Sequence, residues 1–221
     1  MKDSDSTIGT YKVVLLGEAG VGKTSIIAQF MDQTFQSDLQ SSTGGTYSSK
    51  SFTYGDNKVI TLEIWDTAGQ ERYRSLTTMF YKDANAACLI YDITRKITFE
   101  EIQTYWVEQI RENAPQDIML ILVGNKSDLT DKEEVDEGIA RDYAREIGAI
   151  YCTTSAKDYI QTCDLFKQIV MKHTGAKNVE IKKDEDESIH TYSEDESVRN
   201  GPMKLSKSKT GDKKGSKKKC C

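Results

Sequence analysis

The chain has 221 residues, of which 37% are hydrophobic, and its formal net charge is −5. This is enough apolar material for one sizeable core but not for two, so we expect one globular domain with a tail. Residues 204–221 carry +7, which leaves −12 on residues 1–203 and argues against nucleic acid as a partner.

Short apolar runs alternate with amphipathic stretches between residues 11 and 173. Strands are predicted for the runs YKVVLLG, VITLEIWD, NAACLIYD, IMLILVGN and AIYCTTSA. Helical periodicity fits residues 23–31, 99–113, 133–147 and 161–173. Residues 46–54 and 59–66 flank the turn GDNK, which is too short for a parallel crossover. We therefore predict a doubly wound α/β fold with helices on both faces of a mostly parallel, six-stranded sheet that has one antiparallel edge hairpin.

Three segments follow from this pattern. Residues 1–10 are expected to be a flexible N-terminus, residues 11–173 the domain, and residues 174–221 a disordered tail that is first acidic and then lysine-rich. Five cysteines without metal-ligand spacing argue against disulfides and structural zinc. The chain also lacks an apolar run of membrane-spanning length and an apolar N-terminal signal, so we expect it in the cytosol.

The first predicted strand is followed by GEAGVGKT, which matches the phosphate-loop pattern G-x-x-x-x-G-K-[ST] between a strand and a helix. Glycines let backbone N–H groups surround an anion, and the helix N-terminus adds partial positive charge. Lys23 would neutralise the β and γ phosphates, and Thr24 would offer a hydroxyl to Mg²⁺. We predict nucleotide contacts for Gly17, Glu18, Ala19, Gly20, Val21, Gly22, Lys23, Thr24 and Ser25. ATP and GTP fit this loop equally well.

The segment GNKSDL, residues 124–129, ends the fifth predicted strand and addresses the choice of base. By itself it is more typical of a polar turn. Beside a phosphate loop, the Asp128 carboxylate can accept from two N–H groups of guanine, which adenine does not offer. Asn125, Lys126 and Asp128 are therefore candidate base contacts, with the Lys126 stem over the base face.

A third block, DTAGQERY, leaves the end of the strand that contains Trp65. Asp66 suits the water shell of Mg²⁺, Gly69 can offer an N–H to the γ-phosphate, and the Gln70 amide can orient an attacking water. Gln70 is the predicted catalytic residue. An Asp after a strand is, taken alone, more often a turn former.

Together with TSAK (154–157), these blocks resemble the small GTPases of the Ras superfamily and, through IWDTAGQERYR, FYKDA and LIYDIT, the Rab family. The resemblance implies a GTP/GDP switch that controls membrane traffic. It also implies that Thr43 closes over the nucleotide and binds Mg²⁺, and that Ser155, Ala156 and Lys157 support the guanine. The implied partners are an exchange factor, a GTPase-activating protein, escort and extraction proteins and effectors at the switch loops, with the chain itself a monomer.

The chain departs from this family at several positions. Gly44 follows Thr43, so the loop should be looser than usual. Phe35 either stacks on the base or makes a plain helix-end contact. Trp65 and Phe80 match two members of an exposed aromatic triad, whereas the third position falls on Ser48, and Tyr47 is expected to point to the opposite face. Ala19 replaces a glycine of Ras, which leaves the hydrolysis rate open.

The final residues, Cys220 and Cys221, resemble the Rab signal for two geranylgeranyl groups. Two lipid chains give stable attachment, to which the lysines add attraction for anionic lipid, so the protein is expected at the cytoplasmic face of an intracellular membrane, cycling with the cytosol. We predict slow GTP hydrolysis unless assisted, because no arginine finger is evident in cis. The alternatives are a GTP-bound membrane scaffold with negligible hydrolysis and, more distantly, a P-loop kinase.

Overall fold

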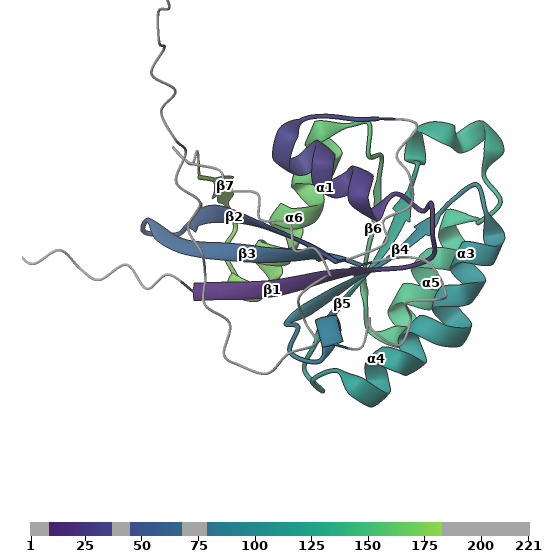
Figure 1. Ribbon diagram of the computed structural model, residues 1–221, viewed down its shortest axis with the longest axis horizontal. Helices are drawn as coiled ribbons and strands as arrows, with labels where there is room; N and C mark the ends of the chain where they lie inside the picture. The colour runs from purple at the N-terminus through teal and green to yellow at the C-terminus, as the bar shows by residue number, and fades with distance from the viewer. Residues whose placement is uncertain (1–8, 37–44, 68–78, 183–221) are drawn as a thin grey trace, which may run out of the picture.

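The computed structural model describes residues 9–36, 45–67 and 79–182 (Figure 1). Its strands are β1 (Gly9–Leu16), β2 (Thr46–Tyr54), β3 (Lys58–Asp66), β4 (Ala86–Asp92), β5 (Met119–Asn125), β6 (Ile150–Thr154) and β7 (Val179–Ile181). The helical elements are α1 (Lys23–Asp32), α3 (Lys96–Glu101), the π-helical turn η2 (Ile102–Trp106), α4 (Val107–Asn113), the 3₁₀ segment η3 (Ser127–Lys132), α5 (Glu137–Ile147) and α6 (Tyr159–Thr174). No described helix is both long and apolar enough to cross a membrane.

The strands form one mixed sheet in the order β6-β5-β4-β1-β3-β2-β7. β1 lies at its centre and pairs in parallel with β3 and β4, while β2 runs antiparallel to β3. The predicted fold class is confirmed, including the antiparallel hairpin. In all parallel strands the carboxyl ends reach the same edge of the sheet, where a doubly wound fold binds its ligand.

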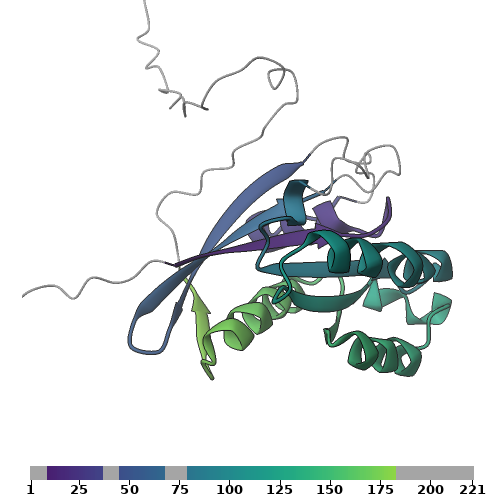
Figure 2. The ribbon, with the colours of Figure 1, turned by 90° about the horizontal axis from the view of Figure 1, so that it is seen from below.

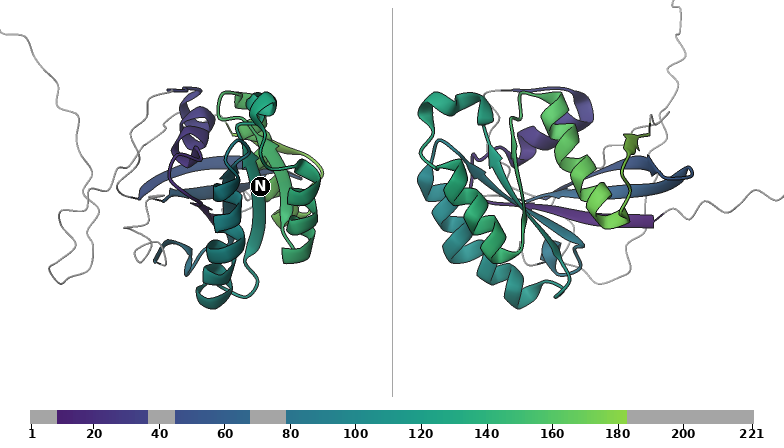
Figure 3. Two further views of the ribbon diagram at one scale, coloured as in Figure 1. Left: turned by 90° about the vertical axis from the view of Figure 1, so that its right-hand side faces the viewer. Right: turned by 180° about the vertical axis from the view of Figure 1, so that it is seen from behind.

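Helices cover both faces of the sheet (Figures 2 and 3). α1 and α6 pack on one face, against a core that includes Val13 and Leu15 of β1. The continuous segment α3–η2–α4 and α5 pack on the other face, against a core that includes Val14 and Leu16. Because successive side chains of a strand point to opposite faces, β1 contributes to both cores and is buried on both sides.

The sheet has seven strands, so the prediction of six is wrong. β7 pairs antiparallel with β2, with Tyr54 opposite Val179 and Phe52 opposite Ile181, and therefore replaces the hairpin at the edge. It lies within residues 174–221, for which the sequence predicts a disordered tail. Three residues are too few to show a strand pattern in a sequence. Their pairing depends on the exposed edge of β2, which only the assembled sheet provides.

Helix ends follow local capping chemistry. Asp136 and Asp158 accept hydrogen bonds from the first-turn N–H groups of α5 and α6, and Gly148 and Gly175 end these helices in the left-handed conformation. α1 differs because its N-cap is Gly22, which has no side chain to cap it. The N-terminal amides of α1 are thus left available to a ligand at the sheet's carboxyl edge.

Candidate nucleotide site

The phosphate loop joins β1 to α1 and requires glycine at two crowded positions. Gly17 has φ +145°, and a Cβ there would lie 2.2 Å from the Ile90 carbonyl oxygen. Gly22 has φ +98°, and its Cβ would lie 2.3 Å from the Asn125 amide nitrogen. Both angles are unfavourable for residues with a side chain. The loop is therefore held against β4 and β5 in a conformation that only glycine tolerates.

Lys23 is buried at the centre of this loop, with 5% of its surface exposed. Its Nζ donates to the backbone carbonyls of Gly17 (2.9 Å) and Glu18 (3.0 Å). Burial lowers the pKa of Lys23 to about 8, although the nearby Asp66 and Glu18 carboxylates act in the opposite direction. The ammonium is thus poorly solvated and would gain from an anion within the loop.

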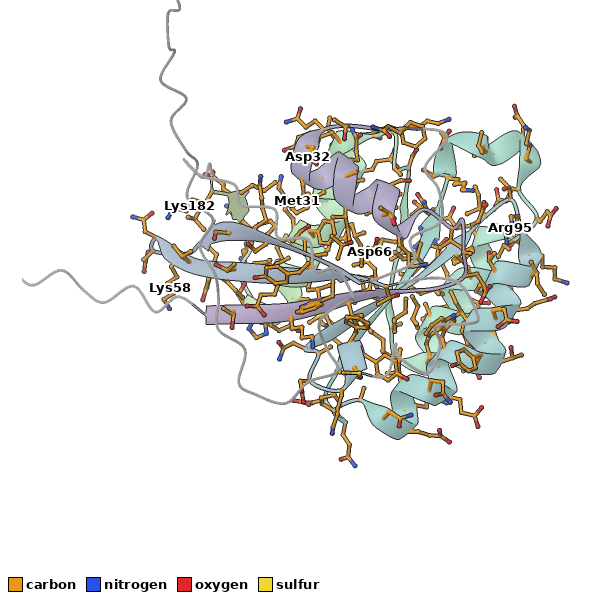
Figure 4. The ribbon with its side chains drawn as sticks, in the orientation of Figure 1. Met31, Asp32, Lys58, Asp66, Arg95 and Lys182 are labelled. Carbon is orange, nitrogen blue, oxygen red and sulfur yellow. The ribbon has the colours of Figure 1, made fainter. Side chains whose placement is uncertain are left out.

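Thr24 and Asp66 meet beside the loop although they are 42 residues apart in sequence. The Thr24 Oγ1 donates to Asp66 Oδ2 at 2.6 Å. Asp66 ends β3, next to β1, and Figure 4 labels it near the turn between β1 and α1. A hydroxyl and a carboxylate are the hard oxygen ligands that Mg²⁺ prefers, and few protein ligands suffice when phosphate and water complete the shell. The two residues fit the predicted magnesium site.

Asn125 connects the phosphate loop to the predicted base-binding loops. Its Nδ2 donates to the Val21 carbonyl (2.6 Å), and its Oδ1 accepts from the Ala156 N–H (3.2 Å). Asn125 itself is buried at the end of β5. One side chain therefore sets the distance between the two ends of the site, a bridging position that sequence reasoning did not anticipate.

Asp128 forms the charged centre of the base end. Its Oδ1 accepts from Ser155 Oγ and its Oδ2 pairs with Lys157 Nζ, both at 2.7 Å. Burial raises the pKa of Asp128, but the hydrogen bonds from Lys157 and Ser155 together outweigh it, so the pKa lies below its ordinary value. The carboxylate is ionised at neutral pH and able to accept from the N–H groups of a base.

Phe35 lies beside this base end, because Lys157 Nζ is 5.7 Å from the centre of its ring. The ring is 41% exposed, which is unusual for a phenylalanine. The plain helix-end contact considered in the sequence analysis does not place it next to Lys157. The aromatic face is thus available close to Asp128.

Two residues of the turn after β4 also reach the site and were missed as site residues. Lys126 Nζ forms an ion pair with the buried Asp92 Oδ2 (2.6 Å), and Arg95 Nη1 donates to the Ala19 carbonyl (3.2 Å). The signal in the sequence was the Asp-x-Thr of LIYDIT, a pattern in which the aspartate accepts from the backbone two residues on. Thr94 N donates to Asp92 Oδ1 in this way.

An aromatic cluster lies on the β2–β3 hairpin, and one expectation about it is wrong. Tyr47, not Ser48, pairs across the strands with Trp65, and their ring centres are 5.2 Å apart. Phe80 lies 5.7 Å from the Trp65 ring. Three residues separate Tyr54 from Lys58 at the turn, so Tyr47 faces the same side as Trp65, and Ser48 is buried opposite Ile64.

Several predicted site residues lie outside the described parts of the chain: Thr43, Gly69, Gln70, Cys220 and Cys221. Their roles stay predictions. The predicted phosphate-loop residues, Asp66, the residues of GNKSDL and Ser155–Lys157 converge at the carboxyl edge of the sheet, through the contacts described above.

Comparisons with known proteins agree with this arrangement. The model of the Ras family matches residues 12–174. Similar curated proteins include Ras-related protein Rab-22A of Mus musculus, 43% identical over 158 residues that span 72% of this chain and 80% of the relative. Rab-22A of Homo sapiens (42%) and Rab-31 of Mus musculus (41%) match over the same shares.

The chain therefore belongs to the Ras family of small GTPases, in its Rab branch. As a member of this family it binds guanine nucleotide and hydrolyses GTP. The family thus decides between the GTPase and the P-loop kinase that the phosphate loop alone left open.

Proposed function

We propose that this GTPase is a GTP/GDP-cycling switch in vesicle-mediated membrane trafficking, and that it recruits effectors in its GTP form. The observation that carries the proposal is the Asn125 bridge, which joins a phosphate loop to a carboxylate suited to guanine. A site with these two ends holds the whole nucleotide rigidly enough for one phosphate to decide the state of the switch.

At the phosphate end, the backbone of residues 17–25 surrounds the phosphates and Lys23 neutralises the β and γ groups. Thr24, Asp66 through water, and Thr43 would hold Mg²⁺. The ion would supply positive charge between the β and γ phosphates. Lys23 leaves its two carbonyl partners for phosphate oxygens, which it reaches without further burial.

At the base end, Asp128 accepts from guanine while Ser155 and Lys157 hold the carboxylate in place. The Ala156 N–H, which donates to Asn125 Oδ1, lies where a second donor toward the base carbonyl is required. The Lys126 stem covers one face of the base and Phe35 the other, which accounts for the exposed phenylalanine beside Lys157.

Hydrolysis is assigned to Gln70, which orients the attacking water, with the Gly69 N–H on the γ-phosphate. The reaction is slow until a GTPase-activating protein supplies further stabilisation of charge. Loss of the γ-phosphate releases Thr43 and the loops on either side, and effectors distinguish the two states. The surface formed by Tyr47, Trp65 and Phe80 gives effectors an aromatic anchor.

Membrane attachment is assigned to geranylgeranyl groups on Cys220 and Cys221, supported by the lysines of residues 204–219. Escort and extraction proteins would handle the lipidated chain, and an exchange factor would reload it with GTP. Residues 174–221 thus tether the domain to the cytoplasmic face of an intracellular membrane.

Nucleotide competition and membrane binding test the proposal. Purified full-length chain with Mg²⁺ and a fluorescent GDP analogue should lose the analogue to GDP or GTP but not to ATP. The geranylgeranylated chain should bind vesicles containing phosphatidylserine, and Cys220→Ser/Cys221→Ser should abolish this. A chain that retains no guanine nucleotide, or that binds vesicles equally without both cysteines, contradicts it.

Single-turnover hydrolysis separates the switch from the scaffold with negligible hydrolysis. Gln70→Ala should slow GTP cleavage about tenfold or more while GDP affinity stays unchanged. Equal rates for the two proteins would favour the scaffold.

A further inference from the structure

We propose that the turn after β4, residues 92–95, is a shared support for both ends of the nucleotide site, with Asp92 and Arg95 as positioning residues. The inference rests on the proposed roles of Lys126 and the phosphate loop. It assigns to two side chains outside the nucleotide-binding blocks a measurable effect on how long the nucleotide stays bound.

The turn is rigid before any ligand arrives. Asp92 is fully buried, and its Oδ1 accepts from the Thr94 N–H (2.9 Å) and the Thr94 hydroxyl (2.7 Å). The Arg95 N–H donates to the Asp92 carbonyl at 3.0 Å. Thr98 Oγ1 accepts from the Asp92 N–H at 3.0 Å, which joins the turn to α3. These bonds leave the second carboxylate oxygen, Oδ2, in one orientation.

That second oxygen holds the base-end lysine. Lys126 Nζ lies 2.6 Å from Asp92 Oδ2, and the Lys126 side chain is only about one-third exposed. The Lys126 backbone is left-handed, with φ +68°, so the residue begins a sharp change of direction. An ion pair with a fully buried carboxylate is hard to break, because either charge alone would lose its solvation. Asp92 thus fixes the ammonium, and the aliphatic stem is presented to the base.

Arg95 acts on the phosphate end from the same turn. Its Nη1 lies 3.2 Å from the Ala19 carbonyl oxygen, and a Cβ built on Gly20 would lie 3.3 Å from the same nitrogen. The guanidinium therefore packs against the Ala19–Gly20 peptide. Gly20 has φ +77°, so this is a part of the loop that could otherwise relax. Figure 4 labels Arg95 near the turn between β1 and α1.

The support connects the two ends through one more residue. The Ile93 N–H donates to the Asn125 carbonyl at 3.1 Å, and the Asn125 side chain donates to Val21 of the phosphate loop. The turn thus touches the base loop at two places and the phosphate loop directly and through Asn125. A turn that only completed the fold would not need its two charged side chains on the two nucleotide loops.

The experiment measures dissociation of a fluorescent GDP analogue from full-length chain with Mg²⁺, in a double-mutant cycle of Asp92→Asn and Lys126→Gln. Asp92→Asn should speed dissociation about tenfold, as expected for loss of a hydrogen bond to a charged group. In the Lys126→Gln background, Asp92→Asn should have almost no further effect.

Arg95 is tested separately because its side chain is exposed and its loss does not threaten folding. Arg95→Gln should speed dissociation about threefold, and Arg95→Lys should restore part of the difference. The matched control is Lys96→Gln, since Lys96 is the adjacent exposed cation and its amine pairs with Glu100 at 3.4 Å. Lys96→Gln should dissociate like the unmodified chain.

The outcomes separate this inference from the proposed function. An unmodified chain that does not retain GDP contradicts both. Retention of GDP combined with additive effects of Asp92→Asn and Lys126→Gln overturns the role of Asp92. Should Asp92→Asn not fold, Arg95→Gln decides, and dissociation equal to that of Lys96→Gln overturns the shared support.

Discussion

The two ends of the nucleotide site are built by different means. At the phosphate end, backbone conformation determines the shape: glycines with positive φ lie against Ile90 and Asn125, and one buried lysine supplies the charge. At the base end, side chains determine it: Asp128, Ser155 and Lys157 form a partly exposed network. A backbone that leaves no space fails abruptly on substitution, whereas exposed side chains can be lost with graded cost.

The largest effect is expected from Gly22→Ala. The new Cβ would lie 2.3 Å from the Asn125 amide nitrogen at a φ of +98°, so the loop or the Asn125 bridge must shift. GDP affinity should fall about a thousandfold or more, measured by titration calorimetry with Mg²⁺. Gly148→Ala is the control, since Gly148 also has positive φ but nothing within 4 Å. It should lower the free energy of unfolding by about 1 kcal/mol and leave affinity unchanged.

Asp128→Ala should have the next largest effect, and mainly on selectivity. Removal of the carboxylate leaves guanine without its acceptor and Lys157 without its partner, so GDP affinity should drop about a hundredfold while ADP affinity hardly changes. Competition of GDP and ADP against a fluorescent analogue measures both. Asp131→Ala, in the same segment η3, should behave like the unmodified chain, and an equal loss in both variants would refute the assignment.

The phosphate end should also depend on pH through Lys23. Its pKa of about 8 in the nucleotide-free protein lies below that of an ordinary lysine. Phosphate favours the charged form and raises this pKa on binding, so a proton is taken up and affinity falls as pH rises above about 8. GDP binding should weaken about tenfold from pH 8 to 9. Calorimetry in two buffers of different ionisation enthalpy detects the proton; no uptake near pH 8.5 would contradict the prediction.

The smallest effect is expected from Ser155→Ala. Asp128 loses one of its two side-chain donors but keeps Lys157, so GDP dissociation should rise only about threefold to tenfold. Since the Ser155 hydrogen bond helps to lower the pKa of Asp128, that pKa should rise, which carboxyl chemical shifts can follow. A loss as large as that of Asp128→Ala would mean that Ser155 carries a role of its own. The base end would then not be graded.

How far the sequence reached is clear from particular residues. Gly17–Thr24 and Asn125–Asp128 were predictable because each block needs a fixed local order of residue types at the end of a strand. Lys23 and Thr24 could be given partners in advance, since the chemistry of phosphate and Mg²⁺ restricts the choice. Asp92 and Arg95 could not, because an aspartate and an arginine near a turn are common and the contacts that distinguish them cross from one loop to another.

The order of strands and helices, the phosphate loop and the preference for guanine thus follow from the sequence by itself, because each depends on neighbours in the chain. Tertiary structure alone decided that β7 covers the edge of β2, that Tyr47 lies beside Trp65, and that Asn125 bridges Val21 and Ala156. Those features depend on strand register and on distances between segments far apart in the chain. Only the packed sheet determines such distances.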